Sequence, residues 1–277
     1  MSDSSALLAD LRRIAAGGAT RSRGEAGAVA ADGWLARGLA RGQLHEVYAG
    51  EAEDAAAAIG FAVAQALAAG ALPLLWIRTE AAEGRTGRML AGGLADLGLP
   101  PDALMLVVTA DEPALLRTAA DAARCAGLGT VLIESWGRAP GLDLTATRRL
   151  MLGAEASGAT VLSIRLDAEP VPSAAATRWR VTAAGSTVMP ADAPGWPAFE
   201  IECLRRRGAP AGSCGRVEWN RDARCFVPPA PVDRAPADRP GTDGPAPRSA
   251  PLPGAGVPVA ADRAVAQRPA APVRRAG

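Results

Sequence analysis

The stretch that decides the fold is Q-L-H-E-V-Y-A-G-E-A-E-D-A-A-A-A-I-G, residues 43–60. Residues 43–48 favour a strand, Ala49 and Gly50 form a short turn, and the alanine-rich run that follows predicts a helix over about 51–69. A strand, a glycine-containing turn and a helix, in this order, are the arrangement of a phosphate-binding P-loop. The sequence therefore predicts the scaffold of a nucleotide-binding α/β protein.

The residues that would bind phosphate are missing from this scaffold. A working loop needs several glycines, a lysine for the β- and γ-phosphates and a Ser or Thr for Mg²⁺. All 30 basic residues of this chain are arginines. The degenerate loop consists of Ala49, Gly50, Glu51, Asp54, Ala55 and Ala56. A helix N-terminus attracts anions, but the carboxylates here, including Glu53, would repel a triphosphate. We therefore expect no cofactor, no bound metal and no enzymatic activity.

Composition narrows the function classes further. A chain of 277 residues can bury one sizeable core, and its net charge of +1 gives no bulk attraction to nucleic acid or to an anionic membrane. The four cysteines form no C-x-x-C pair and His45 is the single histidine, so a zinc site is not expected. Free thiols in a reducing compartment predict a cytoplasmic protein. His45 is expected in a strand near the sheet edge, not as a general base.

One segment is long enough to be considered as a membrane span. Ala55–Ile77 is uncharged over 23 residues, long enough to cross a bilayer. Its alanine content, the Gln65 inside it and the stop signals Gly70 and Pro73 favour a buried helix followed by a buried strand over 72–77. The N-terminus is acidic and lacks an apolar run, so no signal peptide is expected.

The chain divides into three parts. Residues 1–33 predict a short amphipathic helix near 4–15 and a flexible connector; residues 34–227 predict the α/β domain. Residues 228–277 contain 12 of the 23 prolines and few large apolar residues. Such a segment cannot bury enough surface to offset its ordering entropy, so we expect it to be disordered.

Within the α/β domain, apolar strands alternate with helices, which predicts a mainly parallel sheet covered by helices on both faces. The expected strands are Leu72–Ile77, Leu104–Val108, Thr130–Ile133 and Thr160–Leu166, and the expected helices span 86–97, 113–126 and 142–157. After Leu166 the pattern changes to a short antiparallel extension built from Arg178–Val181, Phe199–Leu204 and Val217–Trp219.

The segment G-L-A-R-G-Q-L-H-E-V-Y, residues 38–48, resembles the entry to a RecA-type core. The resemblance puts Glu51 at the E of the RecA P-loop, and Asp54, Ala55 and Ala56 at its G, K and first T. The strand L-W-I-R-T-E places Glu80 at the position of the catalytic glutamate, and T-V-L-I-E-S places Glu134 at the Walker B carboxylate. Without a lysine, both carboxylates are interpreted as vestigial.

Residues 35–227 as a whole resemble ImuA, the RecA-like accessory protein of bacterial SOS mutagenesis. The signatures are L-x-x-G-x-L-H-E-V, D-L-T-A-T-R-R-L at 143–150, A-T-R-W-R-V at 176–181, and the turn L-R-x-R-G at 204–208 followed by V-E-W. The resemblance implies a non-catalytic adaptor in SOS-induced translesion synthesis. Its implied partners are ImuB, a Y-family-like protein, possibly RecA, and an error-prone DnaE-type polymerase.

The expected partner interface is an exposed edge of the antiparallel extension, made of Arg178, Trp179, Arg180, Arg205, Arg206 and Arg207, with Trp219 as a further anchor. Strong direct DNA binding is not expected, because the connections at about 136–141 and 167–176 are short and lack positive charge. Two alternatives remain: a SulA-like inhibitor of the division protein FtsZ, and an ATPase that uses arginine in place of lysine.

Overall fold

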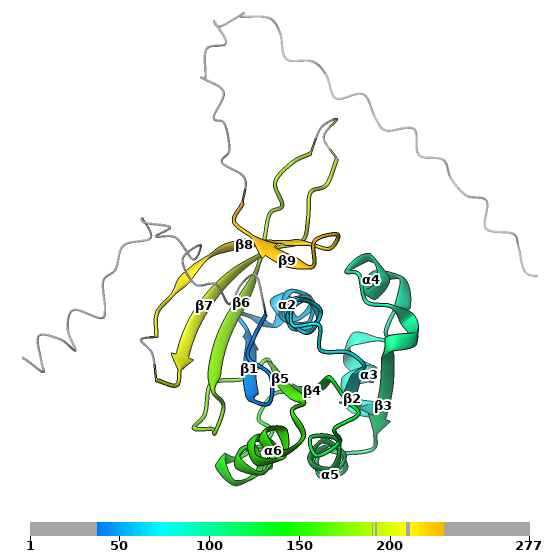
Figure 1. The fold of residues 1–277 in the computed structure, drawn as a ribbon, viewed down its shortest axis with the longest axis vertical. Coiled ribbons are helices and arrows are strands. Elements are labelled where there is room, and N and C mark those ends of the chain that lie inside the picture. Colours follow the sequence, from blue (N-terminus) through cyan, green and yellow to red (C-terminus); the bar gives the residue numbers. More distant parts are fainter. Residues whose placement is uncertain (1–37, 190, 192, 209–210, 230–277) are drawn as a thin grey trace, which may run out of the picture. The chain divides into compact units, whose positions relative to one another are not determined.

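One nine-stranded sheet organises the molecule (Figure 1). The computed structural model describes residues 38–189, 191, 193–208 and 211–229. The strands are β1 (Leu44–Ala49), β2 (Leu74–Thr79), β3 (Leu104–Thr109), β4 (Thr130–Trp136), β5 (Thr160–Leu166), β6 (Thr177–Ala184), β7 (Ala198–Arg206), β8 (Cys214–Asn220) and β9 (Cys225–Val227). Their order across the sheet is β3-β2-β4-β5-β1-β6-β7-β8-β9.

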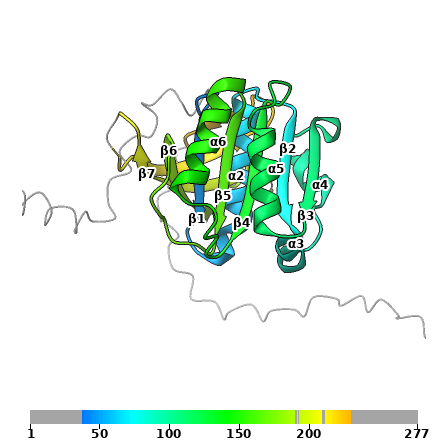
Figure 2. The ribbon, with the colours of Figure 1, turned by 90° about the horizontal axis from the view of Figure 1, so that it is seen from below.

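Helices cover the parallel strands on both faces, as expected from the alternating pattern. They are α2 (Ala55–Ala68), α3 (Glu80–Thr86), α4 (Ala91–Asp96), α5 (Glu112–Ala122) and α6 (Leu144–Ser157), with 3₁₀ turns η2 (Ala52–Asp54) and η3 (Pro101–Ala103). Helices α5 and α6 lie side by side on one face of the sheet, and α2 lies on the opposite face (Figure 2). Among the described residues, no helix is long and apolar enough to cross a membrane.

Local sequence signals fix the helix ends. Asp111 and Asp143 precede α5 and α6, and each side chain accepts a hydrogen bond of 2.8 Å from a backbone N–H of the first turn. Helix α6 ends at Gly158, which has the left-handed conformation that glycine adopts at little cost. Gly38 has a positive φ of 72° and a Cβ there would lie 2.7 Å from the Ala69 nitrogen, so the chain passes tightly across the end of α2.

Two apolar clusters, one on each face, stabilise the sheet. The larger one lies under α2 and extends into the antiparallel strands. Its centre is Phe61 of α2, whose ring centroid lies 5.3 Å from Phe226, 5.9 Å from Phe199 and 6.5 Å from Trp179. The second cluster lies under α5 and α6. The antiparallel extension is therefore part of the same core as the parallel strands.

Several sequence predictions are wrong in detail. The helix predicted over 86–97 is only the short α4, and a helix that was not predicted, α3, precedes it and ends at Gly87. Strand β6 was assigned to the antiparallel extension, but it pairs in parallel with β1 and only its other edge is antiparallel, to β7. Strand β1 is therefore central, and His45 is far from the sheet edge. Strand β9 was not predicted.

The helix predicted near 4–15, the connector that follows it, and the tail beyond residue 229 lie outside the described residues.

Candidate functional site

The degenerate P-loop connects β1 to α2 and is closed onto the neighbouring strand β6. The Gly50 N–H donates to the Val181 carbonyl at 2.9 Å. A Cβ at Gly50 would lie 2.4 Å from Cγ2 of Thr182, so only glycine allows this approach. A loop bonded to a strand in this way does not leave its amide free to bind a phosphate.

The carboxylate of Asp54 binds the loop from inside. Its Oδ2 accepts from the Glu51 N–H at 3.1 Å, and its Oδ1 accepts from the Ala183 N–H of β6 at 2.8 Å. One amide belongs to the residue before the first helical turn and the other to β6, so the carboxylate caps the helix start and ties it to the neighbouring strand. Glu51 and Glu53 are exposed, and Ala55 and Ala56 open α2 without a polar side chain.

A buried polar cluster around Glu134 of β4 lies at the same end of the sheet as the degenerate loop. Its carboxylate accepts from the indole N–H groups of Trp76 at 3.0 Å and Trp136 at 2.9 Å. It also forms an ion pair of 3.2 Å with Arg78 of β2, and the two side chains are 1% and 4% exposed. The Arg78 guanidinium donates further to Thr86 and to the Gly87 carbonyl. The Glu134 carboxylate is therefore fully engaged by protein donors.

Glu80, by contrast, is exposed at the first position of α3. In the described part of the chain, no cluster of three His, Cys, Asp or Glu residues could hold a metal ion. The structure thus places Glu134 in the interior and Glu80 on the surface, and only Glu134 belongs to a network of polar contacts.

The residues predicted as a partner interface lie partly in the core. Trp179 is 2% exposed and Trp219 is completely buried, so neither is a surface anchor. Their indole N–H groups donate to Thr177 Oγ1 and to the Leu97 carbonyl, respectively. The prediction that strand β6 forms an exposed edge is also wrong, because β6 has a neighbour on each side. The pattern of arginines around Trp179 suggested a solvated strand, but alternation of side chains turns the indole toward α2.

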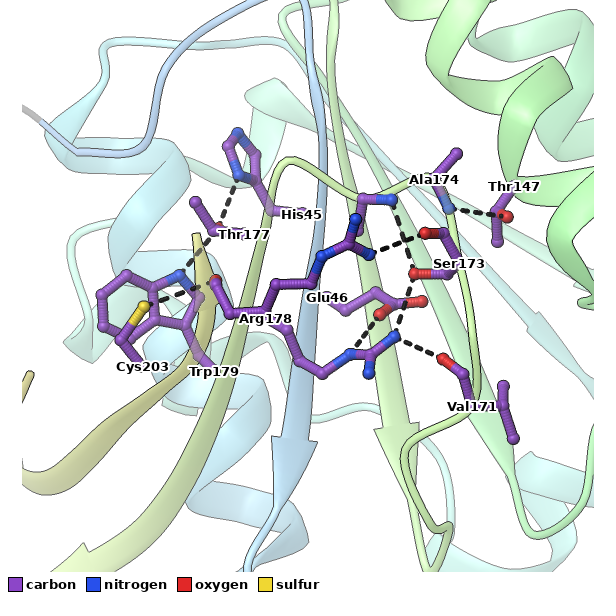
Figure 3. A network of polar contacts seen from close by, with 12 residues as sticks. His45, Glu46, Thr147, Val171, Ser173, Ala174, Thr177, Arg178, Trp179 and Cys203 are labelled. Carbon is purple, nitrogen blue, oxygen red and sulfur yellow. Dashed lines mark hydrogen bonds and ion pairs between the residues drawn. The ribbon is translucent and has the colours of Figure 1, made fainter. Parts of the chain in front are cut away.

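Three of the predicted arginines fix the connection between β5 and β6, and Figure 3 shows one of them, Arg178. Arg178 Nε forms an ion pair of 2.8 Å with the buried Glu46 of β1, and its Nη2 donates to Ser173 Oγ at 3.0 Å and to the Val171 carbonyl. Arg205 Nη1 donates to the Ser173 carbonyl at 2.8 Å, and Arg207 Nη2 to the Ala174 carbonyl at 3.1 Å. These side chains therefore hold the segment 171–174 against the sheet.

The other two arginines lie nearer the surface. Arg180 forms an ion pair of 3.0 Å with Glu202 of β7, and both side chains are nearly half exposed. Arg206 is half-buried and lines a cavity of about 270 Å³ together with Arg207, His45, Thr177 and Trp179. Of the predicted interface, Arg180 and Arg205–Arg207 retain exposed surface.

His45 is buried at the opposite end of β1. Its Nδ1 lies 2.8 Å from Thr177 Oγ1 and its Nε2 lies 2.8 Å from the Ala40 carbonyl oxygen. Burial lowers the pKa of His45 from 6.5 to about 4, although the Ala40 carbonyl opposes the shift. A neutral imidazole with both nitrogens engaged is a structural residue.

Sequence reasoning missed a polar cluster between β1, β5 and β6. It comprises Glu46, Tyr48, Ser163, Arg165 and Arg178, all on the face covered by α5 and α6. The signal was present, because Ser163 and Arg165 interrupt the otherwise apolar strand at alternating positions.

No protein-family model matches the sequence, and no curated protein matches it. The structure is similar to the crystal structure of the RadB recombinase, with a TM-score of 0.50 and 15% sequence identity; the match covers 74% of this chain and 98% of that chain. At this identity the likeness concerns the fold alone. The chain has a RecA-like α/β fold with a mainly parallel sheet and an antiparallel extension, which confirms the predicted fold class.

Proposed function

We propose that this protein is a non-catalytic, ImuA-type adaptor in SOS-induced, error-prone translesion DNA synthesis. The proposal rests on the degenerate P-loop and on the polar cluster around Glu134, where the chain's own groups take up the polar contacts that a nucleotide would need. Asp54 caps the start of the helix and is bonded to β6, and the Walker B-like Glu134 is paired with an arginine and two indoles. Phosphoryl transfer needs positive charge and Mg²⁺ at the phosphates. The arrangement of these two carboxylates supports a RecA-like domain without ATPase activity.

The geometry also weakens the alternative of an arginine-dependent ATPase. The candidate replacement for lysine near the loop is Arg78, and its guanidinium is buried in the ion pair with Glu134. Arg41 precedes β1 and so lies at the other end of that strand from the loop. Arg78 would have to leave Glu134 and two further acceptors to reach a phosphate, at a cost of several kcal/mol.

An adaptor needs a surface for protein partners, and one described edge of the sheet suits that role. Among the described strands, β3 pairs only with β2, so within this part of the chain its outer backbone N–H and C=O groups have no strand partner along the sheet edge. Met105, Leu106 and Val108 on this strand are each about two-fifths exposed. An apolar edge strand is a surface to which a partner's strand can add.

The polar candidate surface retained from the sequence spans both faces of β6 and β7: Arg180 is beside Glu202 on one face, and Arg206 is beside Thr177 on the other. Direct DNA binding through the connection 167–176 is disfavoured, because Arg178, Arg205 and Arg207 donate to carboxylate or carbonyl oxygens of the protein. The partners in this proposal are ImuB, RecA and a DnaE-type polymerase. The protein would act in the cytoplasm and reach DNA through them.

Pull-downs with ImuB and with RecA test the proposal and choose between the two surfaces. Leu106→Glu with Val108→Glu changes the β3 edge, and Arg180→Glu with Arg206→Glu changes the polar surface. Leu90→Glu is the matched control, because Leu90 is 78% exposed and lies outside both surfaces. We expect one double variant to lose at least tenfold in affinity while Leu90→Glu binds normally. Capture of FtsZ, with no binding to ImuB or RecA, would instead favour a SulA-like division inhibitor.

Binding of Mg-ATP measured by isothermal titration is the second test. We expect no binding at micromolar concentrations. A dissociation constant in the low micromolar range would contradict a domain whose loop is capped by Asp54 and bonded to β6.

A further inference from the structure

A block of four polar side chains lies buried on the α5 and α6 face of β1 and β5. Glu46 is directly opposite Ser163, and Tyr48 is directly opposite Arg165. The intervening residues Val47 and Ile164 point to the other face and belong to the cluster under α2. The four polar side chains are each at most 2% exposed, so the block lies inside the protein.

Arg165 is the unusual member of the block. Its Nε and Nη1 are sealed from solvent and have no hydrogen-bond partner, and no carboxylate of the described residues forms an ion pair with it. Its guanidinium carbon lies 5.8 Å from the centre of the Tyr48 ring. Arg178 also approaches this ring, at 5.5 Å, but its charge is matched by Glu46. Buried arginines are ordinarily paired, since an uncompensated charge costs several kcal/mol.

The neighbours of Arg165 are unpaired as well. Ser163 Oγ and Glu46 Oε1 are sealed and lack a hydrogen-bond partner, and Tyr48 Oη, although the Val171 backbone lies near it, has no acceptor for its own proton. Burial and the Glu46 charge raise the pKa of Tyr48, so its hydroxyl keeps its proton and can donate. Two guanidinium groups face one carboxylate, which leaves one positive charge in excess. Donors with excess positive charge are the chemistry that binds an oxyanion.

We propose that this block binds phosphate, either the free inorganic ion or the phosphoryl group of a small phosphomonoester. Arg165 contributes a single charge-assisted N–H donor to the anion, from Nε or from Nη1, because these two groups lie on different edges of the guanidinium and do not form a bidentate pair. Tyr48 and Ser163 each donate a hydroxyl hydrogen to another oxygen. The free Oε1 of Glu46 accepts from the protonated oxygen of phosphate, a hydrogen that sulfate lacks at neutral pH.

The segment 167–176 covers the block and controls access to it. Arg178 bridges the two, because it stacks near Tyr48 and donates to Ser173 and to the Val171 carbonyl of the segment (Figure 3). Ala174 is tied to α6 through its N–H, which donates to Thr147 Oγ1 at 3.1 Å. Asp167 and Glu169 are exposed on the same segment and disfavour an approaching anion. Entry therefore requires these contacts to open, and we expect slow exchange.

The test is the thermal stability of the full chain in increasing inorganic phosphate, with ionic strength held constant by sodium chloride. A phosphate concentration of ten times the dissociation constant should raise Tm by about 3–6 °C, and the rise should saturate. Sulfate should act at a concentration at least tenfold higher. Arg165→Met should abolish the saturable rise. Asp167→Asn should lower the phosphate concentration at which half of the rise is reached. Arg148→Met is the matched control, because Arg148 is exposed on α6 and should respond like the wild type.

Tyr48→Phe and Ser163→Ala keep the proposal testable if Arg165→Met does not fold. Each removes one hydroxyl and should shift the phosphate midpoint upward at least threefold. Glycerol phosphate distinguishes the two sources: a rise as large as that given by inorganic phosphate indicates a phosphomonoester, and no rise indicates the free ion. An equal phosphate response in the wild type, Tyr48→Phe and Ser163→Ala would overturn the proposal and leave only water in the block.

Discussion

Replacing Glu134 by glutamine tests whether this carboxylate is a catalytic relic or a structural residue. The two side chains have nearly the same shape, so the change isolates charge and hydrogen bonding. All three groups that contact the Glu134 carboxylate are donors: Arg78 Nη2 and Trp136 Nε1 at Oε1, and Trp76 Nε1 at Oε2. A glutamine would direct its NH₂ group at one of these donors.

The expected cost follows from the burial of the pair. Glu134 and Arg78 are nearly completely buried, and removing one partner leaves an uncompensated buried charge, which costs about 3–5 kcal/mol. For a domain of this size, that loss lowers Tm by roughly 6–20 °C. Arg78→Met should cost a similar amount, because it leaves the carboxylate charged and buried. The double variant Arg78→Met with Glu134→Gln should be more stable than the sum of the single losses predicts.

Urea unfolding of the four proteins, followed by circular dichroism, gives the coupling free energy. Glu83→Gln is the control, since Glu83 pairs only with the largely exposed Arg88 and should cost less than about 1 kcal/mol. A carboxylate that is kept for catalysis commonly adds nothing to the free energy of unfolding or lowers it, so its removal does not destabilise the protein. A Glu134→Gln protein as stable as the wild type would therefore refute the structural role.

Three other variants or conditions test the remaining structural assignments. Asp54→Ala should cost about 1–2 kcal/mol because two backbone N–H groups lose their acceptor, and calorimetry should still detect no ATP binding. The free energy of unfolding should fall as pH drops from 6.5 toward 4, because His45 takes up a proton in the unfolded state and stays neutral in the folded state. The loss is about 3 kcal/mol, and urea titrations of the His45→Gln variant should not show it. A chain ending at Val227 should melt at the same temperature as the full chain, and a loss of several degrees would show that the tail contributes to folding.

The sequence contained enough information for the order of elements in the parallel half. Apolar runs such as Thr160–Leu166 are strands because both faces are covered, and Asp143 and Gly158 mark the ends of α6. The sequence did not reveal that β6 pairs with β1. Strand direction depends on how far the chain crosses over the sheet, and the connection 167–176 carries no helix to signal a parallel crossover.

The candidate site was harder to predict, because the role of each side chain depends on partners that are distant in the sequence. The sequence singles out Glu134, but the identity of its partner, Arg78, requires that β2 and β4 be neighbours. The arginines of the extension were taken as surface charges. Arg205 and Arg207 donate to carbonyls of an irregular segment, Arg178 and Arg180 pair with glutamates of neighbouring strands, and no periodicity in the sequence indicates such contacts.

The loop closed by Asp54 has a consequence for regulation. RecA-like domains that bind ATP can change state with the nucleotide, so their activity follows the cell's ATP to ADP ratio. Under the proposal that this loop binds no ATP, the domain keeps one conformation at any ratio of ATP to ADP. We expect the amount of active protein to follow its synthesis and degradation alone, so that control passes from a ligand cycle to gene expression and proteolysis.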